Sequence, residues 1–414
     1  MAKQHNTNLD ILRGVAALVV VLHHLVSYSS GFDRKYSLGP VLNYNFPAHL
    51  CVIVFFILSG YVIGLNHPTM SNKAEISSYI RKRLIRILPI YFIAVLFTVL
   101  IWGRNYSLFT IFSNLFFISV PLDNVIIEDS PLWSLNYELI YYFLFIFFCY
   151  FKINLSKTLK ALLIIIAIVF LFFHNVKIYP LLISYFIGFI FWIAGAMIAK
   201  NNWPEWKVSH SRMVSIFMLI FCLQPFNPYG PIIKVLKIPT VDYSSYSFFQ
   251  QSISYNDLFF FPLTLLLIFS LNRFHSRYNK LLFYFTIVLS VFRLLMLFYT
   301  YGWNYVIKEH YVAPSIILIS SILLWIFNFQ FINKVKKAIK STAALSKVSY
   351  ALYVIHLPIL LCFGMIQATS WFYFVVKIIV ALVTLFIVSY LLEDKFQPYI
   401  KRLLLKRKAS AING

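Results

Sequence analysis

The apolar stretch "LDILRGVAALVVVLHH" ends in two histidines, of which His23 is the adjacent extra, and the side chains of Arg13 and His24 could do chemistry. They lie eleven residues apart, close to three helical turns, so a helix presents both on nearly the same face, about 16 Å apart along its axis. An imidazole can move a proton near neutral pH, and a guanidinium binds anions. An ionisable side chain inside a membrane helix usually marks a functional site. The spacing equally allows a structural interpretation, in which a neighbouring helix satisfies His24 and Arg13 extends to the interface.

Arg83 and Arg86, in "RKRLIRILPIY", lie one helical turn apart. Such a pair can hold phosphate groups bidentately, although an ordinary cluster of cytoplasmic positive charge would explain the same pattern. By helical rise, Glu138 in "SPLWSLNYELIYYF" lies about 10 Å below the outer surface, at a depth similar to that of His24. A carboxylate at that depth needs a partner, so Glu138 and His24 could meet.

Arg293, in "SVFRLLMLFY", falls in the middle of a predicted membrane span, where an unpaired cation is costly. Either it neutralises Glu138 or helps to hold a sugar or a thioester oxygen, or the span begins later and Arg293 belongs to a cytoplasmic connection. Ser59 is followed by Gly60 at the end of another span, a pattern that also suits close helix packing. His356 lies nearer the cytoplasmic side of a late span.

The elements that must position these residues are membrane helices. The chain of 414 residues is 61% hydrophobic and only 12% charged, which leaves too little polar surface for a soluble domain. Its apolar stretches have lengths suited to crossing a bilayer. We therefore predict an all-α, polytopic membrane helical bundle with 10–12 transmembrane helices. The twelve candidate spans are 9–28, 47–65, 87–102, 131–150, 161–174, 179–199, 213–224, 257–271, 281–301, 312–331, 348–368 and 371–392.

The net charge of +23 orients this bundle and does not require a nucleic-acid partner. Of the 36 Lys and Arg residues, 27 lie in the N-terminus through Arg13, the even-numbered connections and the C-terminal tail, seven lie in the odd-numbered connections, and Arg293 and Lys377 lie inside spans. The positive-inside rule then predicts that both termini are cytoplasmic. We expect one membrane domain over residues 1–393 and a short basic cytoplasmic tail over 394–414. The four cysteines are too widely spaced for a metal site or a disulfide framework, so no metal is expected.

Five motifs in order resemble those of the acyltransferase-3 family of integral membrane acyltransferases. Arg13 and His24 match its arginine followed after ten residues by a histidine, and Arg83 with Arg86 matches its Arg-x-x-Arg. Two residues of this chain depart from the family pattern, because Cys51 and Ile53 stand where Gly and an acidic residue are common. The remaining matches are Phe55, Phe56, Leu58, Ser59 and Gly60 to "FFxLSG", Trp133, Ser134, Leu135, Glu138 and Tyr142 to "WSLxxExxxY", and Ser349, Tyr350, Tyr353 and His356 to "SYxxYxxH".

The resemblance implies that an acyl group, most often acetyl from acetyl-CoA, moves to a hydroxyl of a cell-surface polysaccharide or its lipid-linked precursor in a bacterial cytoplasmic (inner) membrane. His24 would be the general base or a transient acyl carrier, and Glu138 would orient it. Arg83 and Arg86 would bind the donor, and Arg13 would bind a CoA phosphate or hold the pathway open. The residues expected to contact substrate are Ser59, Trp133, Tyr142, Arg293 and His356.

A transporter or flippase for a glycan or lipid-linked substrate is the alternative function. Twelve spans with both termini inside suit a transporter, and buried Arg, His and Glu could form a proton relay. Against it, the chain has no visible internal repeat. The sequence leaves open the sugar, the hydroxyl, the acyl length, whether the acceptor is polymeric, lipid-linked or a small molecule, and the oligomeric state.

Overall fold

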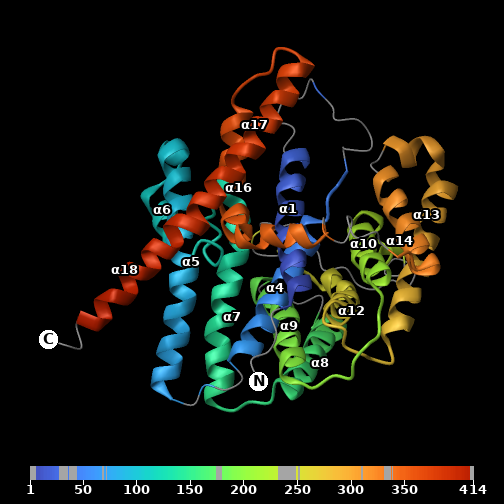
Figure 1. The fold of residues 1–414 in the computed structure, drawn as a ribbon, viewed down its shortest axis with the longest axis horizontal. Helices are drawn as coiled ribbons and strands as arrows, with labels where there is room; N and C mark the ends of the chain where they lie inside the picture. Colours follow the sequence, from blue (N-terminus) through green and yellow to red (C-terminus); the bar gives the residue numbers. More distant parts are fainter. Residues whose placement is uncertain are drawn as a thin grey trace. The chain divides into compact units, whose positions relative to one another are not determined.

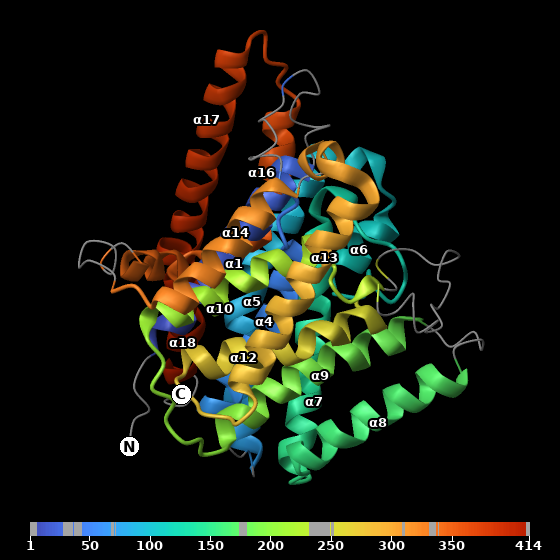
Figure 2. The same ribbon diagram turned by 90° about the vertical axis from the view of Figure 1, so that its right-hand side faces the viewer.

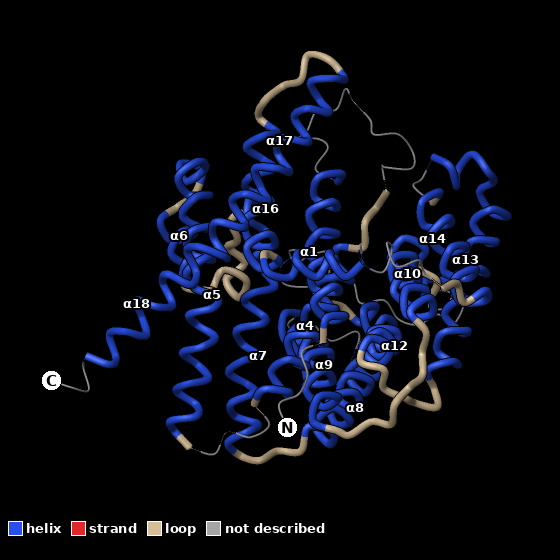
Figure 3. Tube along the Cα trace, in the orientation of Figure 1, coloured by secondary structure: helices blue, strands red, loops and turns tan. Residues whose placement is uncertain are grey.

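A computed structural model describes most of the chain, and in the described residues every regular element is a helix (Figures 1 and 3). One isolated bridge, between Glu205 and Phe274, is the sole β-type pairing found there. The described residues are 6–27, 36, 44–67, 70, 72–173, 180–231, 249, 252–308, 311–330, 337 and 339–410.

The chain forms two compact units, each assembled from segments far apart in sequence. Unit 1 comprises Met1–Ser27, Ser37–Asn66 and Asn154–Ala343, and unit 2 comprises Tyr28–Tyr36, His67–Ile153 and Ala344–Gly414.

Unit 1 is built around the contact between two apolar helices, α4 and α9. Gly60 and Gly195 allow this contact, because a Cβ added to Gly60 would lie 1.8 Å from the carbonyl oxygen of Trp192, and one added to Gly195 would lie 2.0 Å from that of Ile57. Helix α1 packs on α4, and α8 runs beside α9 (Figure 2). The helices of unit 1 are α1 (Thr7–Ser27), α4 (Ala48–Asn66), α8 (Leu155–Phe173), α9 (Pro180–Lys200), α10 (His210–Phe226), η4 (Tyr255–Phe260), α12 (Phe261–Leu271), α13 (Asn279–Lys308) and α14 (Val312–Phe327).

Unit 2 is built on the long helix α5, which begins where the Asn72 side chain accepts a hydrogen bond from the backbone NH of Glu75. Helices α16 and α18 both pack against α5. The helices of this unit are α5 (Lys73–Trp102), η1 (Gly103–Asn105), α6 (Leu108–Leu115), η2 (Ile127–Leu132), α7 (Trp133–Tyr150), α16 (Ser349–Gly364), α17 (Trp371–Tyr390), η6 (Leu391–Phe396) and α18 (Gln397–Ser410), and η5 (Thr342–Lys347) lies at the boundary of the two units.

The prediction of an all-α membrane bundle is confirmed. Among the described residues, eight helices are long and apolar enough to cross a membrane, or nine if the bent pair Ile339–Lys347 and Ser349–Gly364 is one span. Three shorter apolar helices, His210–Phe226, Tyr255–Leu271 and Val312–Phe327, occupy the other predicted spans. Large apolar side chains such as Val288 and Leu295 are exposed, which suits contact with lipid. The side of the membrane on which each terminus lies stays a prediction.

Candidate active site

Helix α1 holds His24 near its C-terminal end and fixes its ring. The ring atom Nδ1 lies 2.9 Å from the carbonyl oxygen of Val20, one turn earlier in the same helix. In neutral imidazole one ring nitrogen carries the proton, and a carbonyl can only accept, so the Nδ1–H donates to Val20 and the lone pair is on Nε2. His23 packs edge-on against His24, with 5.2 Å between ring centroids. Arg13 lies eleven residues earlier in this helix, as predicted, and is partly exposed like His24.

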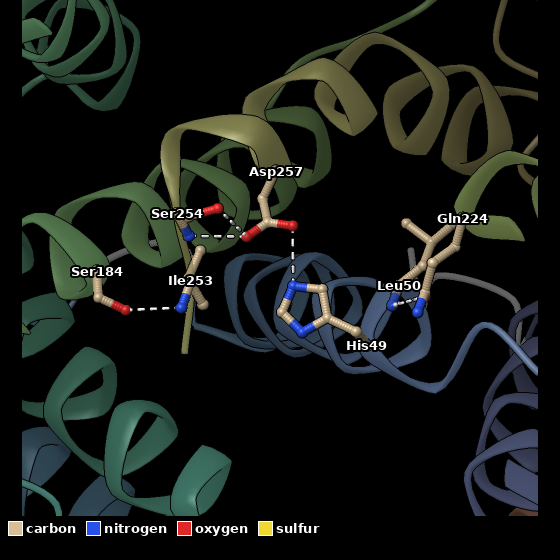
Figure 4. Close-up of polar contacts among 7 residues, drawn as sticks. All are labelled: His49, Leu50, Ser184, Gln224, Ile253, Ser254 and Asp257. Atoms are coloured by element: carbon tan, nitrogen blue, oxygen red, sulfur yellow. Dashed lines mark hydrogen bonds and ion pairs between the residues drawn. The ribbon is translucent and has the colours of Figure 1, made fainter. Parts of the chain in front are cut away.

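A second imidazole that the sequence analysis did not single out lies at the same end of unit 1. His49, in the first turn of α4, has its Nε2 2.8 Å from Oδ1 of Asp257 in η4 (Figure 4). His49 is close enough to His23 for their charges to interact, and the His23 ring is hydrogen-bonded to the backbone of Phe46. The signals available in the sequence were an isolated His and an Asp, each at the start of an apolar span, 208 positions apart.

The other two candidate residues of unit 1 make structural contacts. Ser59 lies at the α4–α9 contact, where its Oγ accepts a hydrogen bond from Nε1 of Trp192 at 3.4 Å. Arg293 lies within helix α13, before its kink at Gly302, and not in a connection before the helix. Its Nε donates to the carbonyl oxygen of Phe226 at 3.0 Å, so the guanidinium caps the C-terminal end of α10.

In unit 2, Glu138 and Arg83 lie against the same tyrosine. The Tyr142 hydroxyl donates a short hydrogen bond to Oε1 of Glu138, one helical turn away on α7. The Arg83 guanidinium lies 5.8 Å from the centroid of the Tyr142 ring and 5.7 Å from that of Tyr79. The Nε of Arg83 is buried and has no hydrogen-bond partner within the described part of the chain. A buried guanidinium NH without a partner is a donor available to an anion.

A basic pocket of about 590 Å³ surrounds this arginine between α5 and α18. Its cationic lining consists of Arg81, Lys82, Arg83 and Arg86 from α5 and Lys401 from α18, and none of its lining residues is acidic. The pocket therefore has the charge and the size to take a ligand with several phosphate groups.

The late motif packs α16 within unit 2. The Tyr353 hydroxyl donates to the carbonyl oxygen of Pro131 at 2.8 Å and lies 2.7 Å from Oγ of Ser134. His356 is fully buried, and its Nδ1 lies 2.7 Å from the carbonyl oxygen of Tyr353. Trp133 is buried and packs edge-on against Tyr137 at 5.2 Å between ring centroids.

The predicted site residues thus fall into two groups. Arg13, His24, Ser59 and Arg293 belong to unit 1, whereas Arg83, Arg86, Trp133, Glu138, Tyr142 and His356 belong to unit 2. The pairing of Glu138 with His24, and that of Glu138 with Arg293, stay predictions. Among the described residues no group of three or more His, Cys, Asp or Glu side chains could hold a metal ion.

The protein is a multi-pass helical membrane protein. It has an oriented imidazole in one unit and a basic pocket in the other, and a membrane group-transfer enzyme needs groups of both kinds. A family model described as "Acyltransferase domain" matches residues 6–279. The chain belongs to this acyltransferase-3 family and is a membrane acyltransferase. The matched residues include Arg13, His24 and Glu138, whereas His356 lies beyond them. No curated protein and no solved structure matches the chain.

Proposed function

We propose that this protein is a bacterial cytoplasmic-membrane O-acyltransferase that moves an acetyl group from acetyl-CoA to a hydroxyl of a cell-surface polysaccharide or its lipid-linked precursor. The observation that carries the proposal is the basic pocket on α5, which Arg83 and four other cationic residues line. Acetyl-CoA carries three phosphate groups on a water-soluble head, and five cationic side chains in one pocket are suited to bind them.

His24 supplies the base. Its Nδ1–H donates to Val20, so the lone pair of the neutral ring is on Nε2, the atom that takes the proton of the acceptor hydroxyl. The hydroxyl oxygen bonds to the acetyl carbonyl carbon, the carbon–sulfur bond breaks, and the hydroxyl proton passes through His24 to the leaving sulfur. The products are the acetyl ester and free CoA. A transient acetyl group on Nε2 would use the same lone pair.

Glu138 keeps the role that the sequence predicts for it, to stabilise the imidazolium of His24 as a carboxylate does in other catalytic pairs. Tyr142 holds this carboxylate by the hydrogen bond already described. Arg13 binds a CoA phosphate or holds the pathway open between donor and acceptor. Trp133 and Tyr142 lie on the same helix as Glu138, which supports acceptor contacts there. Ser59, Arg293 and His356 contact the substrate in this proposal, since the Ser59 hydroxyl can donate as well as accept and the Arg293 guanidinium has donors besides Nε.

The test is the mass of the surface glycan from cells that carry wild-type protein, His24→Ala or no protein. An acetyl increment present with wild type and absent in the other two supports the proposal, and a general base contributes about 10²–10⁴-fold to rate. His275→Ala is the matched control, because His275 is an exposed histidine of unit 1 in the connection between α12 and α13. Glu138→Gln should lower the acetyl content less than His24→Ala does. Full acetylation in His24→Ala cells would refute the assignment of the base.

A further inference from the structure

The end of unit 1 at which α1 ends and α4 begins carries a second oriented imidazole. Its ring is held by a carboxylate that α4 itself lacks, since no Asp or Glu occurs in α4. Asp257 comes from η4 and lies 2.8 Å from Nε2 of His49 (Figure 4). This is the arrangement in which a carboxylate fixes the orientation of a functional imidazole.

Asp257 cannot easily turn away from His49. Its second oxygen, Oδ2, accepts hydrogen bonds from the backbone NH of Ser254 at 2.7 Å and from the Ser254 hydroxyl at 3.4 Å. The preceding residue, Ile253, donates its NH to Oγ of Ser184 at 2.8 Å, which anchors this segment to α9. The carboxylate is almost completely buried. Both of its oxygens are therefore occupied, and they hold the His49 ring in one orientation.

This orientation leaves Nδ1 of His49 available. The His49 side chain is 26% exposed, and in the described part of the chain Nδ1 has no hydrogen-bond partner. In neutral imidazole with Nε2–H directed at Asp257, Nδ1 accepts a hydrogen bond, and in imidazolium it donates one. A hydroxyl group can satisfy Nδ1 in both states, whereas an anion satisfies only the imidazolium. The chemistry of this position therefore favours a hydroxyl group.

His49 is linked to the candidate base, His24, through His23. Its charge interacts with that of His23, which lies edge-on against His24. The backbone of Phe46, three residues before His49, is hydrogen-bonded to the His23 ring. The two imidazoles with an oriented ring, His24 and His49, thus flank His23 at one end of one unit.

We propose that His49 and Asp257 form an acceptor-binding pair, in which Nδ1 of His49 binds a hydroxyl group of a sugar while a second hydroxyl of the same sugar is presented to His24. This inference rests on the proposed function, because it concerns the acceptor of the same reaction. It adds that the acceptor is a sugar with at least two free hydroxyl groups. His49 is a positioning residue for one of them.

The test uses the full-length protein in lipid nanodiscs, with acetyl-CoA as donor and glycan isolated from cells that lack the protein as acceptor. His49→Gln retains an amide NH that can reach Asp257 and removes the Nδ1 atom. We expect the KM for the glycan to rise roughly tenfold, the effect of losing one hydrogen bond of about 1.4 kcal/mol, with the KM for acetyl-CoA unchanged. An unchanged glycan KM, or equal rises in both KM values, would overturn the proposal.

Two further variants separate positioning from folding. Asp257→Asn preserves the shape of the side chain but no longer fixes the orientation of the His49 ring. It should therefore also raise the KM for the glycan. The double variant His49→Gln/Asp257→Asn should be no worse than His49→Gln alone, because the two residues act as one unit. Ser270→Ala is the matched structural control, because it removes a buried hydrogen bond near the C-terminal end of α12 and touches neither His49 nor Asp257. It should lower the unfolding temperature and leave the glycan KM unchanged.

Equilibrium binding of the glycan without donor distinguishes this proposal from the proposed function. Glycan binding that His49→Gln weakens, without any acetyl transfer by wild-type protein, would support the pair and refute the transfer reaction. Acetyl transfer that His49→Gln leaves unaltered would refute the pair and support the reaction. Wild-type protein that neither binds nor acetylates the glycan would overturn both.

Discussion

Units 1 and 2 each contain reactive side chains, but they hold them in opposite ways. In unit 1 the imidazoles of His24 and His49 are oriented by a carbonyl and by a carboxylate. In unit 2 the guanidinium of Arg83 has a buried NH that finds no partner among the described residues, and Arg83 lines an open pocket with other cations. A base must present its lone pair in a fixed direction, whereas an anion site must keep its donors unsatisfied until the ligand arrives.

Packing follows the same contrast. In unit 1, α4, which carries His49 in its first turn, packs on α9 through the glycine contact, where backbone meets backbone. In unit 2, α5 and α18 leave a pocket between them, and its lining side chains are long and charged. Close packing keeps an imidazole ring in one orientation, whereas flexible cationic side chains can move to match the positions of phosphate groups.

The largest expected effect comes from removing the cations of unit 2. Arg83→Ala/Arg86→Ala should raise the KM for acetyl-CoA about a hundredfold or more, since each charge-assisted hydrogen bond contributes about 1.5–3 kcal/mol. The KM for the glycan should not change. Arg104→Ala is the control, because Arg104 is an exposed arginine of unit 2 outside the pocket. Steady-state kinetics measures both constants. An unchanged KM for acetyl-CoA would show that the cations of unit 2 do not bind the donor.

A smaller effect is expected on the packing of unit 1. Gly60→Ala should lower the free energy of unfolding by about 1–3 kcal/mol, because the added Cβ meets the Trp192 carbonyl at 1.8 Å and the backbones must separate. Gly103→Ala in unit 2 is the control, since its Cβ would meet only the Val99 side chain, at 3.0 Å. Thermal unfolding in nanodiscs compares the two variants. Equal stability would show that α4 and α9 are not held together by this close contact.

The smallest effect concerns His67, which lies in the connection before α5 and packs on the Tyr79 ring at 5.1 Å between centroids. Partial burial and the charges of Arg83 and Lys82 lower the pKa of His67 below its usual value. Donor phosphates would offset those charges and raise this pKa, so binding takes up protons. Donor affinity should therefore increase as the pH falls below about 6.5.

We expect this increase to be less than tenfold, because His67 is only partly buried and solvent screens its charge. The measurement is the dissociation constant of CoA between pH 5.5 and 7.5, compared between wild type and His67→Gln. Because the CoA phosphates titrate in the same way with both proteins, the difference between the two pH profiles reports His67 alone. Parallel pH profiles for the two proteins would show that His67 lies too far from the donor to sense it.

Much of this protein could be predicted from local sequence alone. The length and hydropathy of each span predicted a helical membrane bundle, because a helix satisfies its own backbone and must match the bilayer thickness. Arg83 and Arg86 line one pocket because residues three apart share a helix face. The order of the motifs indicated the family, and the match over residues 6–279 confirmed it.

What the sequence could not determine are contacts between segments far apart in the chain. Asp257 is 208 positions from His49, Lys401 joins α5 residues more than 300 positions earlier, and Arg293 caps the end of α10 instead of standing exposed in its span. A side chain's type and its place along a helix are local properties, and the sequence states them directly. Its partner depends on which helices pack together and at what rotation, and only the tertiary structure decides that, because many pairings of apolar helices bury similar area.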